Sequence, residues 1–170
     1  MDVALIKSFY NPISKVKVPE RSICADTGCE IEWIPILPSG KQGNYMGITQ
    51  KGLWCVGTAQ NLRILDHPKW YLHCIALMEN PFDEVVALLR GLFGADIDVY
   101  NIFPFVEIID FSFHYDASSY WIQLAVEWID QVEPEKRQTF LNGLKKTINN
   151  KDVSQKSRHK ARKITRQILS

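Results

Sequence analysis

Acidic and aromatic side chains gather in one stretch of the chain, residues 91–134. This stretch holds eight Asp or Glu residues and no Lys or Arg, and it is also the most aromatic part of the sequence. Carboxylates beside aromatic rings suit a surface that receives a basic protein, because acids steer a cationic partner and rings anchor it. The simpler interpretation is a helical core with a solvated acidic face, and composition alone does not separate the two.

The residues expected to bind a partner are the acids and tyrosines that fall off the apolar helical stripes or lie in turns. Loops and outward faces of adjacent helical hairpins lie side by side when hairpins stack, so these side chains would merge into one patch. The expected set is Asp96, Asp98, Tyr100, Glu107, Asp110, Tyr115, Asp116, Tyr120, Glu127, Asp130 and Glu133.

A basic C-terminal segment is the second charged feature. Residues 135–170 carry 11 Lys or Arg and 2 Asp or Glu, a net charge of +9, whereas residues 1–134 carry 9 and 17, a net charge of −8. Arg158, Arg162 and Lys163 are the residues that would bind phosphate. The favoured interpretation is instead the polar outer face of a terminal helix, and a further alternative is that the acidic body balances these bases internally. No aromatic residue follows Phe140, so nucleic-acid bases have no stacking platform there.

The cysteines give weak support to a metal site. Cys24 and Cys29 are separated by four residues, and Cys55 and Cys74 lack the close spacing of a zinc-ligand pair. Buried free thiols are the favoured interpretation of this pattern.

The carboxylates and histidines give no recognisable catalytic motif. Asp96 and Asp98 could bind a divalent cation, but they precede a predicted helix, where acids are favoured by the helix dipole. His114 lies between Asp110 and Asp116 without a neighbouring nucleophile motif, and the chain has no glycine-rich phosphate-binding loop. We therefore expect no catalytic residue, no metal and no cofactor.

The chain has no apolar run approaching the roughly 20 residues that span a bilayer. Asp2 stands where a secretory signal would carry bases. These features predict a cytoplasmic protein with reduced thiols and no membrane partner.

Proline and glycine divide residues 1–65 into short segments, which we expect to contain no helix. Pro35 would end its strand or confine it to a sheet edge. Residues 39–44 read as a hairpin loop. The predicted strands are 15–18, 30–34, 45–49 and 53–56.

From Asp66 onward the apolar spacing becomes helical. The first predicted helix runs from Asp66 to about Glu79, and the second follows the capping residue Asn80 and ends at Gly94. A third lies within 98–113, where Pro104 starts or kinks its main part. Three more begin after Asp116, at Glu133–Pro134, and after Asp152 or Ser154.

The helix starts repeat with a constant spacing. Asn80, Asp116 and Asp152 are each 36 residues apart, and apolar or small residues follow at the same offsets. Three copies of one pattern are typical of stacked helical hairpins. The equivalent packed positions are then Leu89, Ala125 and Ala161.

The last unit, residues 152–161, resembles the second helix of a HEAT-type repeat. Arg158 and Ala161 match that family's pattern, but Ser157 stands where the family has Val. Val86 and Ile122 stand in place of the Arg in the earlier units. The resemblance implies a short α-solenoid over residues 66–170, and such arrays are mostly binding scaffolds.

The sequence thus predicts an α+β, mainly α chain: a β-rich part over residues 1–65, then three HEAT-like antiparallel helix pairs over 66–170, in one compact unit. The expected function is protein–protein interaction, and more specifically an immunity or antitoxin protein that occludes a basic, nucleic-acid-cleaving toxin. The alternatives are a nucleic-acid-binding module that uses the basic C-terminal helix, and an enzyme of unknown type. A body of charge −8 beside the site disfavours the nucleic-acid alternative.

Overall fold

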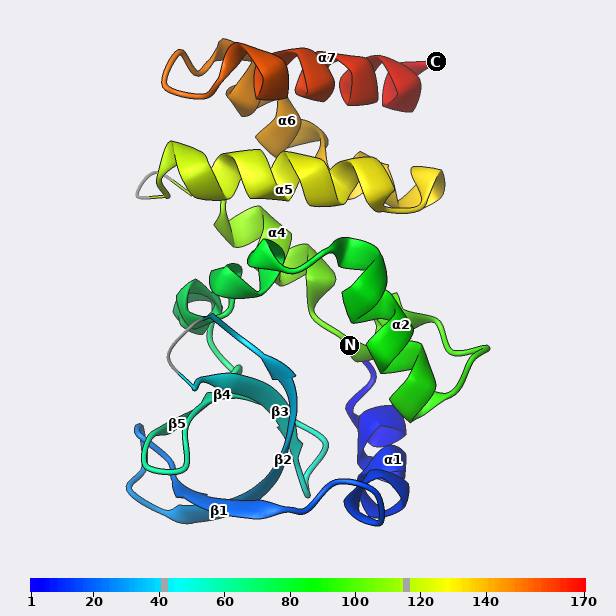
Figure 1. Cartoon of the computed structure of the whole chain (residues 1–170). Coiled ribbons are helices and arrows are strands. Elements are labelled where there is room, and N and C mark those ends of the chain that lie inside the picture. The colour runs from blue at the N-terminus through cyan, green and yellow to red at the C-terminus, as the bar shows by residue number, and fades with distance from the viewer. Residues whose placement is uncertain (41–42, 115–116) are drawn as a thin grey trace.

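The computed structural model of the chain describes residues 1–40, 43–114 and 117–170. A curled antiparallel sheet lies at one end, and helices stack away from it toward the C-terminus (Figure 1). Each strand pairs with its neighbour in the sequence, in the order β1-β2-β3-β4-β5. The strands are β1 Glu20–Ile23, β2 Glu30–Pro38, β3 Tyr45–Thr49, β4 Trp54–Gly57 and β5 Leu62–Ile64.

The sheet curls until its first and last strands meet. Cys24 forms an isolated bridge with Leu62, whose carbonyl accepts a 2.8 Å hydrogen bond from the Ala25 amide. The concave side encloses a small apolar cluster of Trp33, Cys55 and Leu62. Gly47 makes room for this cluster, because a Cβ there would lie 2.6 Å from the Trp33 ring.

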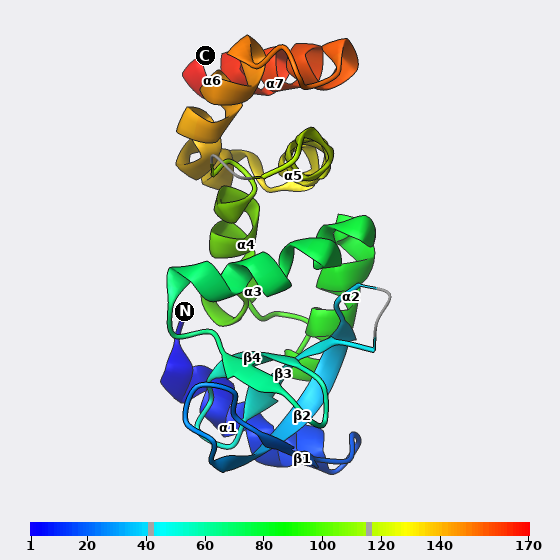
Figure 2. The ribbon, with the colours of Figure 1, turned by 90° about the vertical axis from the view of Figure 1, so that its left-hand side faces the viewer.

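The convex side of the sheet packs on the helices through alternate strand residues, among them Ile34, Met46 and Trp54. Helix α1 (Val3–Ser14) lies against this side and runs along β2 and β3. The main apolar core continues from the sheet through the helices as far as Ile164. In Figure 2 the N-terminus lies beside the helix at residues 99–102, where the Asp2 amide donates to the carbonyl of Asn101.

Helix α1 corrects the expectation that residues 1–65 contain no helix. The Asp2 carboxylate caps its first turn by accepting from the Leu5 amide at 3.0 Å. Ile6, Tyr10 and Ile13 form a buried stripe. Pro12 lies in the last turn, where the loss of one backbone hydrogen bond is outweighed by the cap and the buried stripe.

Three of the predicted strands are confirmed as β2, β3 and β4, but residues 15–18 form no strand and β5 was not predicted. The prediction that Pro35 ends its strand or confines it to an edge is wrong, since β2 pairs with both β1 and β3. The reason lies in the register. β1 covers only residues 30–33 of β2, so no β1 carbonyl needs an amide at Pro35, and a bulge follows it.

Residues 68–79 form two consecutive 3-10 helices, η1 (Pro68–His73) and η2 (Ile75–Glu79), in place of the single α-helix expected there. Amides of Cys74, Leu77 and Asn80 each bond the carbonyl three residues earlier. This period of three aligns the buried Tyr71, Cys74 and Leu77 on one side. Core packing at that spacing therefore selects the tighter helix.

The remaining helices start close to the predicted positions. Pro104 divides the 98–113 segment, and Ser154 caps the last helix by accepting from the Ser157 amide. The helices are α2 Phe82–Phe93, α3 Val99–Ile102, α4 Phe105–Phe111, α5 Ser119–Gln131, η3 Pro134–Phe140, α6 Leu141–Asn149 and α7 Gln155–Leu169. No helix within the described ranges is both long and apolar enough to cross a membrane.

The predicted HEAT-like solenoid is wrong, and the chain is a mixed α+β protein. The 36-residue spacing does mark the starts of α2, α5 and α7, but the segments between them are not equivalent helices. Two 3-10 helices precede α2, and the broken pair α3 and α4 precedes α5. Among the described residues, α6 and α7 alone pack as an extended helical hairpin, and the curled sheet covers the other end (Figure 1).

Candidate functional site

Most aromatic rings of residues 91–134 lie inside the protein. Phe93, Phe103, Phe105 and Trp128 are buried, whereas Tyr120 is exposed. These rings therefore build the core beneath the acidic residues and do not form a broad aromatic surface.

Two of these rings, Phe105 and Trp128, form a buried cluster with Phe82 that joins α2, α4 and α5. The Phe82 ring lies 5.1 Å from that of Phe105 and 5.3 Å from that of Trp128. The indole of Trp128 also donates a 3.0 Å hydrogen bond to the carbonyl of Asn80. These contacts fix the first turn of α2 against α5, which sets the shape of the surface above them.

A groove of about 410 Å³ opens between α2, α3 and the C-terminal end of α5. We call it the α2–α5 groove. Its apolar lining consists of Phe82, Val86, Ala87 and Val99. Its polar rim consists of Asp83, Arg90, Tyr100, Gln131 and Glu133.

Tyr100 lies half-buried in this groove and already receives a cation. The Lys136 ammonium lies 4.1 Å from the centre of its ring. Burial raises the pKa of the Tyr100 hydroxyl to about 12, so the phenol stays protonated. The ring therefore offers an apolar face and a neutral hydroxyl.

Asp98 holds Lys136 over that ring. Both carboxylate oxygens accept from the ammonium, at 3.0 and 2.8 Å, and Oδ1 also accepts from the Tyr100 amide as the cap of α3. The hydrogen bond from Lys136 lowers the pKa of Asp98, with a smaller contribution from the Tyr100 amide. Asp98 is thus paired within the chain and positions the groove.

The surroundings of the groove carry an excess of acid. Residues 81–102 and 131–136 together contain six Asp or Glu and two Lys or Arg, a net charge of −4. Asp83 and Glu133 are exposed on opposite walls. Within the described residues, neither forms an ion pair.

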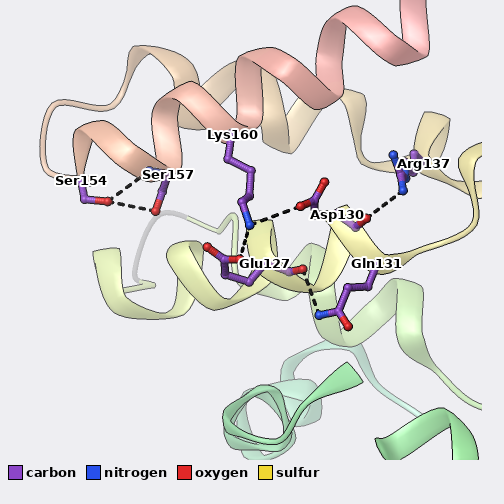
Figure 3. Close-up of polar contacts among 7 residues, drawn as sticks. All are labelled: Glu127, Asp130, Gln131, Arg137, Ser154, Ser157 and Lys160. Atoms are coloured by element: carbon purple, nitrogen blue, oxygen red, sulfur yellow. Dashed lines mark hydrogen bonds and ion pairs between the residues drawn. The ribbon is translucent and has the colours of Figure 1, made fainter. Parts of the chain in front are cut away.

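Glu127 and Asp130 lie apart from the groove, on the side of α5 that faces α7. The Lys160 ammonium binds the Glu127 carboxylate and lies 3.3 Å from that of Asp130 (Figure 3). Burial would lower the pKa of Lys160, but the hydrogen bonds to these two acids outweigh it and raise the pKa. Both acids therefore hold a neighbouring helix.

Arg137 fastens the C-terminal end of α5. Its guanidinium donates to the carbonyl of Asp130 at 2.8 Å (Figure 3) and to that of Val132 at 2.7 Å. It also reaches Gln167 on α7 at 3.3 Å. These bonds satisfy helix-end carbonyls and fix the chain direction into η3.

The other predicted partner-binding residues are dispersed. Asp96 is exposed between α2 and α3, and on α4 Glu107 is half-buried and Asp110 exposed. Tyr120 is exposed, and its hydroxyl donates to Glu79 at 3.0 Å. Tyr115 and Asp116 lie outside the described residues. Of the predicted set, the structure brings Asp98, Tyr100 and Glu133 together at the groove, and it brings Glu127 and Asp130 together at Lys160.

The α2 wall of the groove was missed because it precedes the acidic stretch. Asp83, Val86, Ala87 and Arg90 follow the spacing i, i+3, i+4, i+7, which is the signal of a second helix face beside the core-facing one. This helix face could be predicted from the sequence, but the opposite wall of the groove could not.

The predicted phosphate-binding residues and the cysteines lie elsewhere. Arg162 and Lys163 are exposed on α7 and Arg158 is half-buried. The four thiols are free; Cys29 alone is exposed among them, and burial raises the pKa of Cys55 and Cys74. No group of three or more His, Cys, Asp or Glu in residues 1–40, 43–114 and 117–170 could hold a metal ion.

In the α2–α5 groove, residues of the predicted partner-binding set line a hollow together with α2 residues that were not predicted. Its chemistry is a neutral phenol, an apolar floor, a carboxylate on each wall and the guanidinium of Arg90. No family model, curated protein or solved structure matches the chain, so a function is assigned on this geometry alone.

Proposed function

We propose that the chain is a protein-binding module whose α2–α5 groove receives a side chain from a basic partner protein. The observation that carries this proposal is an apolar floor with an exposed carboxylate on each wall, Asp83 on α2 and Glu133 beyond the end of α5. An apolar centre within a polar rim is the usual anatomy of a protein interface. A concave pocket at its centre is where an anchoring side chain binds.

The groove suits the side chain of a Lys or Arg. The aliphatic part would lie on Val86 and Val99, and the charged end would reach a carboxylate on either wall. Lys136 shows the same chemistry within the chain, since it combines the Asp98 carboxylate with the Tyr100 ring. The net charge of −4 around the groove would also speed the approach of a basic protein.

The specific form of this proposal is an immunity or antitoxin protein whose partner is a basic, nucleic-acid-cleaving toxin. Such an enzyme presents a cationic surface to phosphates, and the carboxylates of the groove would occupy that surface in their place. The dispersed acids Asp96 and Asp110 would act at longer range, by steering association.

The test compares two charge-reversed variants of equal net charge. Asp83→Lys with Glu133→Lys changes both walls, whereas Glu84→Lys with Glu135→Lys changes two exposed neighbours outside the lining. Each is used as bait in extracts of the native source, and retained proteins are identified by mass spectrometry after thermal melts have confirmed folding.

A basic protein that is retained by the wild type and the control, and lost with the groove variant, would support the proposal. Buried acid–base pairs at such a position should matter by about 2–5 kcal/mol on truncation. Equal recovery on all three baits would contradict the groove as the binding site. A retained partner that is acidic would contradict the basic class of the partner.

A further inference from the structure

We propose that α7 carries a second, independent binding surface, which takes the phosphate backbone of a nucleic-acid duplex. The surface is the outward face of α7, formed by His159, Arg162, Lys163 and Arg166, and we call it the basic face of α7. It lies at the far end of the molecule from the sheet, on the last helix of the stack (Figure 1).

These four side chains share one side of the helix. Their spacing of i, i+3, i+4 and i+7 places them on successive turns, and all four are exposed. The buried residues of α7 include Ala161 and Ile164, which lie on the opposite side. A hollow of about 460 Å³ runs between the four basic side chains and Gln167.

The positive charge of this end is not neutralised by the acidic body. Residues 141–170 carry nine Lys or Arg and one Asp. Lys160 turns inward to Glu127 and Asp130, and it is the one base of this segment that the described residues engage in an ion pair. Lys145, Lys146, Lys151 and Lys156 are exposed on α6, the loop and the first turn of α7, and they add to the positive charge of this end.

The helix is held rigidly enough to present this face as one unit. Ser154 caps its first turn through the Ser157 amide, and the Lys160 ion pairs hold it on α5 (Figure 3). Ala161 and Ile164 are fully buried beneath it. Binding therefore costs little ordering of the backbone, because the helix that carries the four basic residues is already held in place.

The chemistry of the face favours a duplex over other polyanions. The sequence has no aromatic residue after Phe140, so single-stranded bases have nothing to stack on at this end. A membrane-bound amphipathic helix inserts its apolar side into lipid, whereas the apolar side of α7 is occupied by the protein core. What remains is a cationic ridge that contacts phosphates without reading bases, and such binding is independent of sequence and strongly sensitive to salt.

The test measures binding of the full chain to a DNA duplex and to an RNA duplex of the same sequence, each of about 20 base pairs, by fluorescence anisotropy. About three phosphate contacts, from Arg162, Lys163 and Arg166, predict a loss of about 40-fold in affinity between about 50 and about 200 mM salt. Binding of either duplex with this salt dependence supports the proposal, and the two arms tell which backbone is preferred.

The decisive variant is Arg162→Gln with Lys163→Gln and Arg166→Gln. It should lose at least about tenfold in affinity at low salt and most of the salt dependence. The matched control, Lys7→Gln with Lys15→Gln and Lys51→Gln, removes the same charge from exposed lysines of the N-terminal half and should bind within about twofold of wild type.

Equal losses in both variants would overturn the proposal, because net charge and not the basic face would then govern binding. So would the absence of salt-dependent duplex binding by the wild type at low salt. Vesicles of phosphatidylserine and phosphatidylcholine serve as the competing polyanion. Tighter binding to these vesicles than to either duplex, lost in the α7 variant, would assign the face to a membrane instead.

The Asp83→Lys and Glu133→Lys variant of the groove keeps the basic face intact. We expect this variant to lose the protein partner and still to bind a duplex. The two surfaces are therefore tested separately.

Discussion

Two helical glycines give opposite expectations for the same substitution. Gly91 lies third from the end of α2, and Gly143 lies third from the start of α6. A Cβ on Gly91 would meet nothing within 4 Å, whereas a Cβ on Gly143 would lie 2.3 Å from Cδ2 of the Phe113 ring. The ring of Phe113 packs against the α6 backbone at Gly143, where no side chain stands.

The magnitudes follow from that contact. Alanine in place of glycine stabilises a helix by about 0.5–1 kcal/mol, so Gly91→Ala should raise the free energy of unfolding by about that amount. Gly143→Ala has the same helical gain, but it must displace a largely buried ring, and overpacking of this kind costs about 1–3 kcal/mol. We therefore expect Gly143→Ala to be neutral to destabilising by about 2 kcal/mol.

Urea unfolding followed by circular dichroism measures both variants under one set of conditions. A second substitution, Phe113→Leu, makes room for the new methyl group, so Gly143→Ala should cost less in that background than in the wild type. Stabilisation by Gly143→Ala equal to that by Gly91→Ala would refute the packing of Phe113 on α6.

Two further expectations concern buried and titrating groups. Burial and then the Arg63 guanidinium lower the pKa of His73 from 6.5, so the unfolded chain binds this proton more readily and stability falls as pH drops below that value. When the pH falls from about 7 to about 5, His73→Gln should therefore lose less stability than the wild type. If the urea midpoints of the two proteins fall by the same amount, the lowered pKa of His73 is contradicted. Ala125 is fully buried in α5, so Ala125→Arg should destabilise by about 3–5 kcal/mol, and a thermal midpoint unchanged from wild type would exclude this packing.

Local patterns located most elements but not their partners. Alternation predicted three strands, and capping residues with apolar stripes predicted where α2 and α7 begin. Helix α1 was not predicted, because Pro12 was taken as a helix breaker, whereas the Asp2 cap and the buried stripe through Ile6 and Ile13 hold the helix in spite of it. The closure of the sheet at Cys24 and Leu62 depends on curl accumulated over five strands, which no short stretch of sequence encodes.

The solenoid was predicted from the regular spacing of helix starts, which is present in the structure but does not produce a solenoid. The starts of α2, α5 and α7 are evenly spaced, but even spacing states only where helices begin. A solenoid also requires equivalent partner helices between them, and Pro104 and the period-three packing of Tyr71 and Cys74 prevent these. The predicted partner-binding residues lie on separate surfaces for the same reason. Periodicity places Glu127 off the inward stripe of α5, but it does not reveal that α7 covers that side of the helix.

The last prediction separates the acids that hold the fold from those that face a partner. Lys160→Met keeps the aliphatic stem on α7 and leaves Glu127 and Asp130 facing an apolar group. Each ion pair is partly exposed, so solvent screening limits its contribution to less than about 1 kcal/mol, and we expect the loss of both to destabilise by about 1 kcal/mol.

Removing the two carboxylates as well, by Glu127→Gln and Asp130→Asn, should recover part of that loss, because the acids no longer repel each other without their cation. With Lys160 kept, reversal of Glu127 and Asp130 to Lys should destabilise more than Lys160→Met does, since three ammonium groups would then meet between α5 and α7. Glu133 lines the groove. Glu133→Lys should therefore leave the urea midpoint unchanged and weaken the capture of a basic partner. If reversal of Glu127 and Asp130 instead leaves stability intact and abolishes capture, these acids face the partner and the assignment of the groove fails.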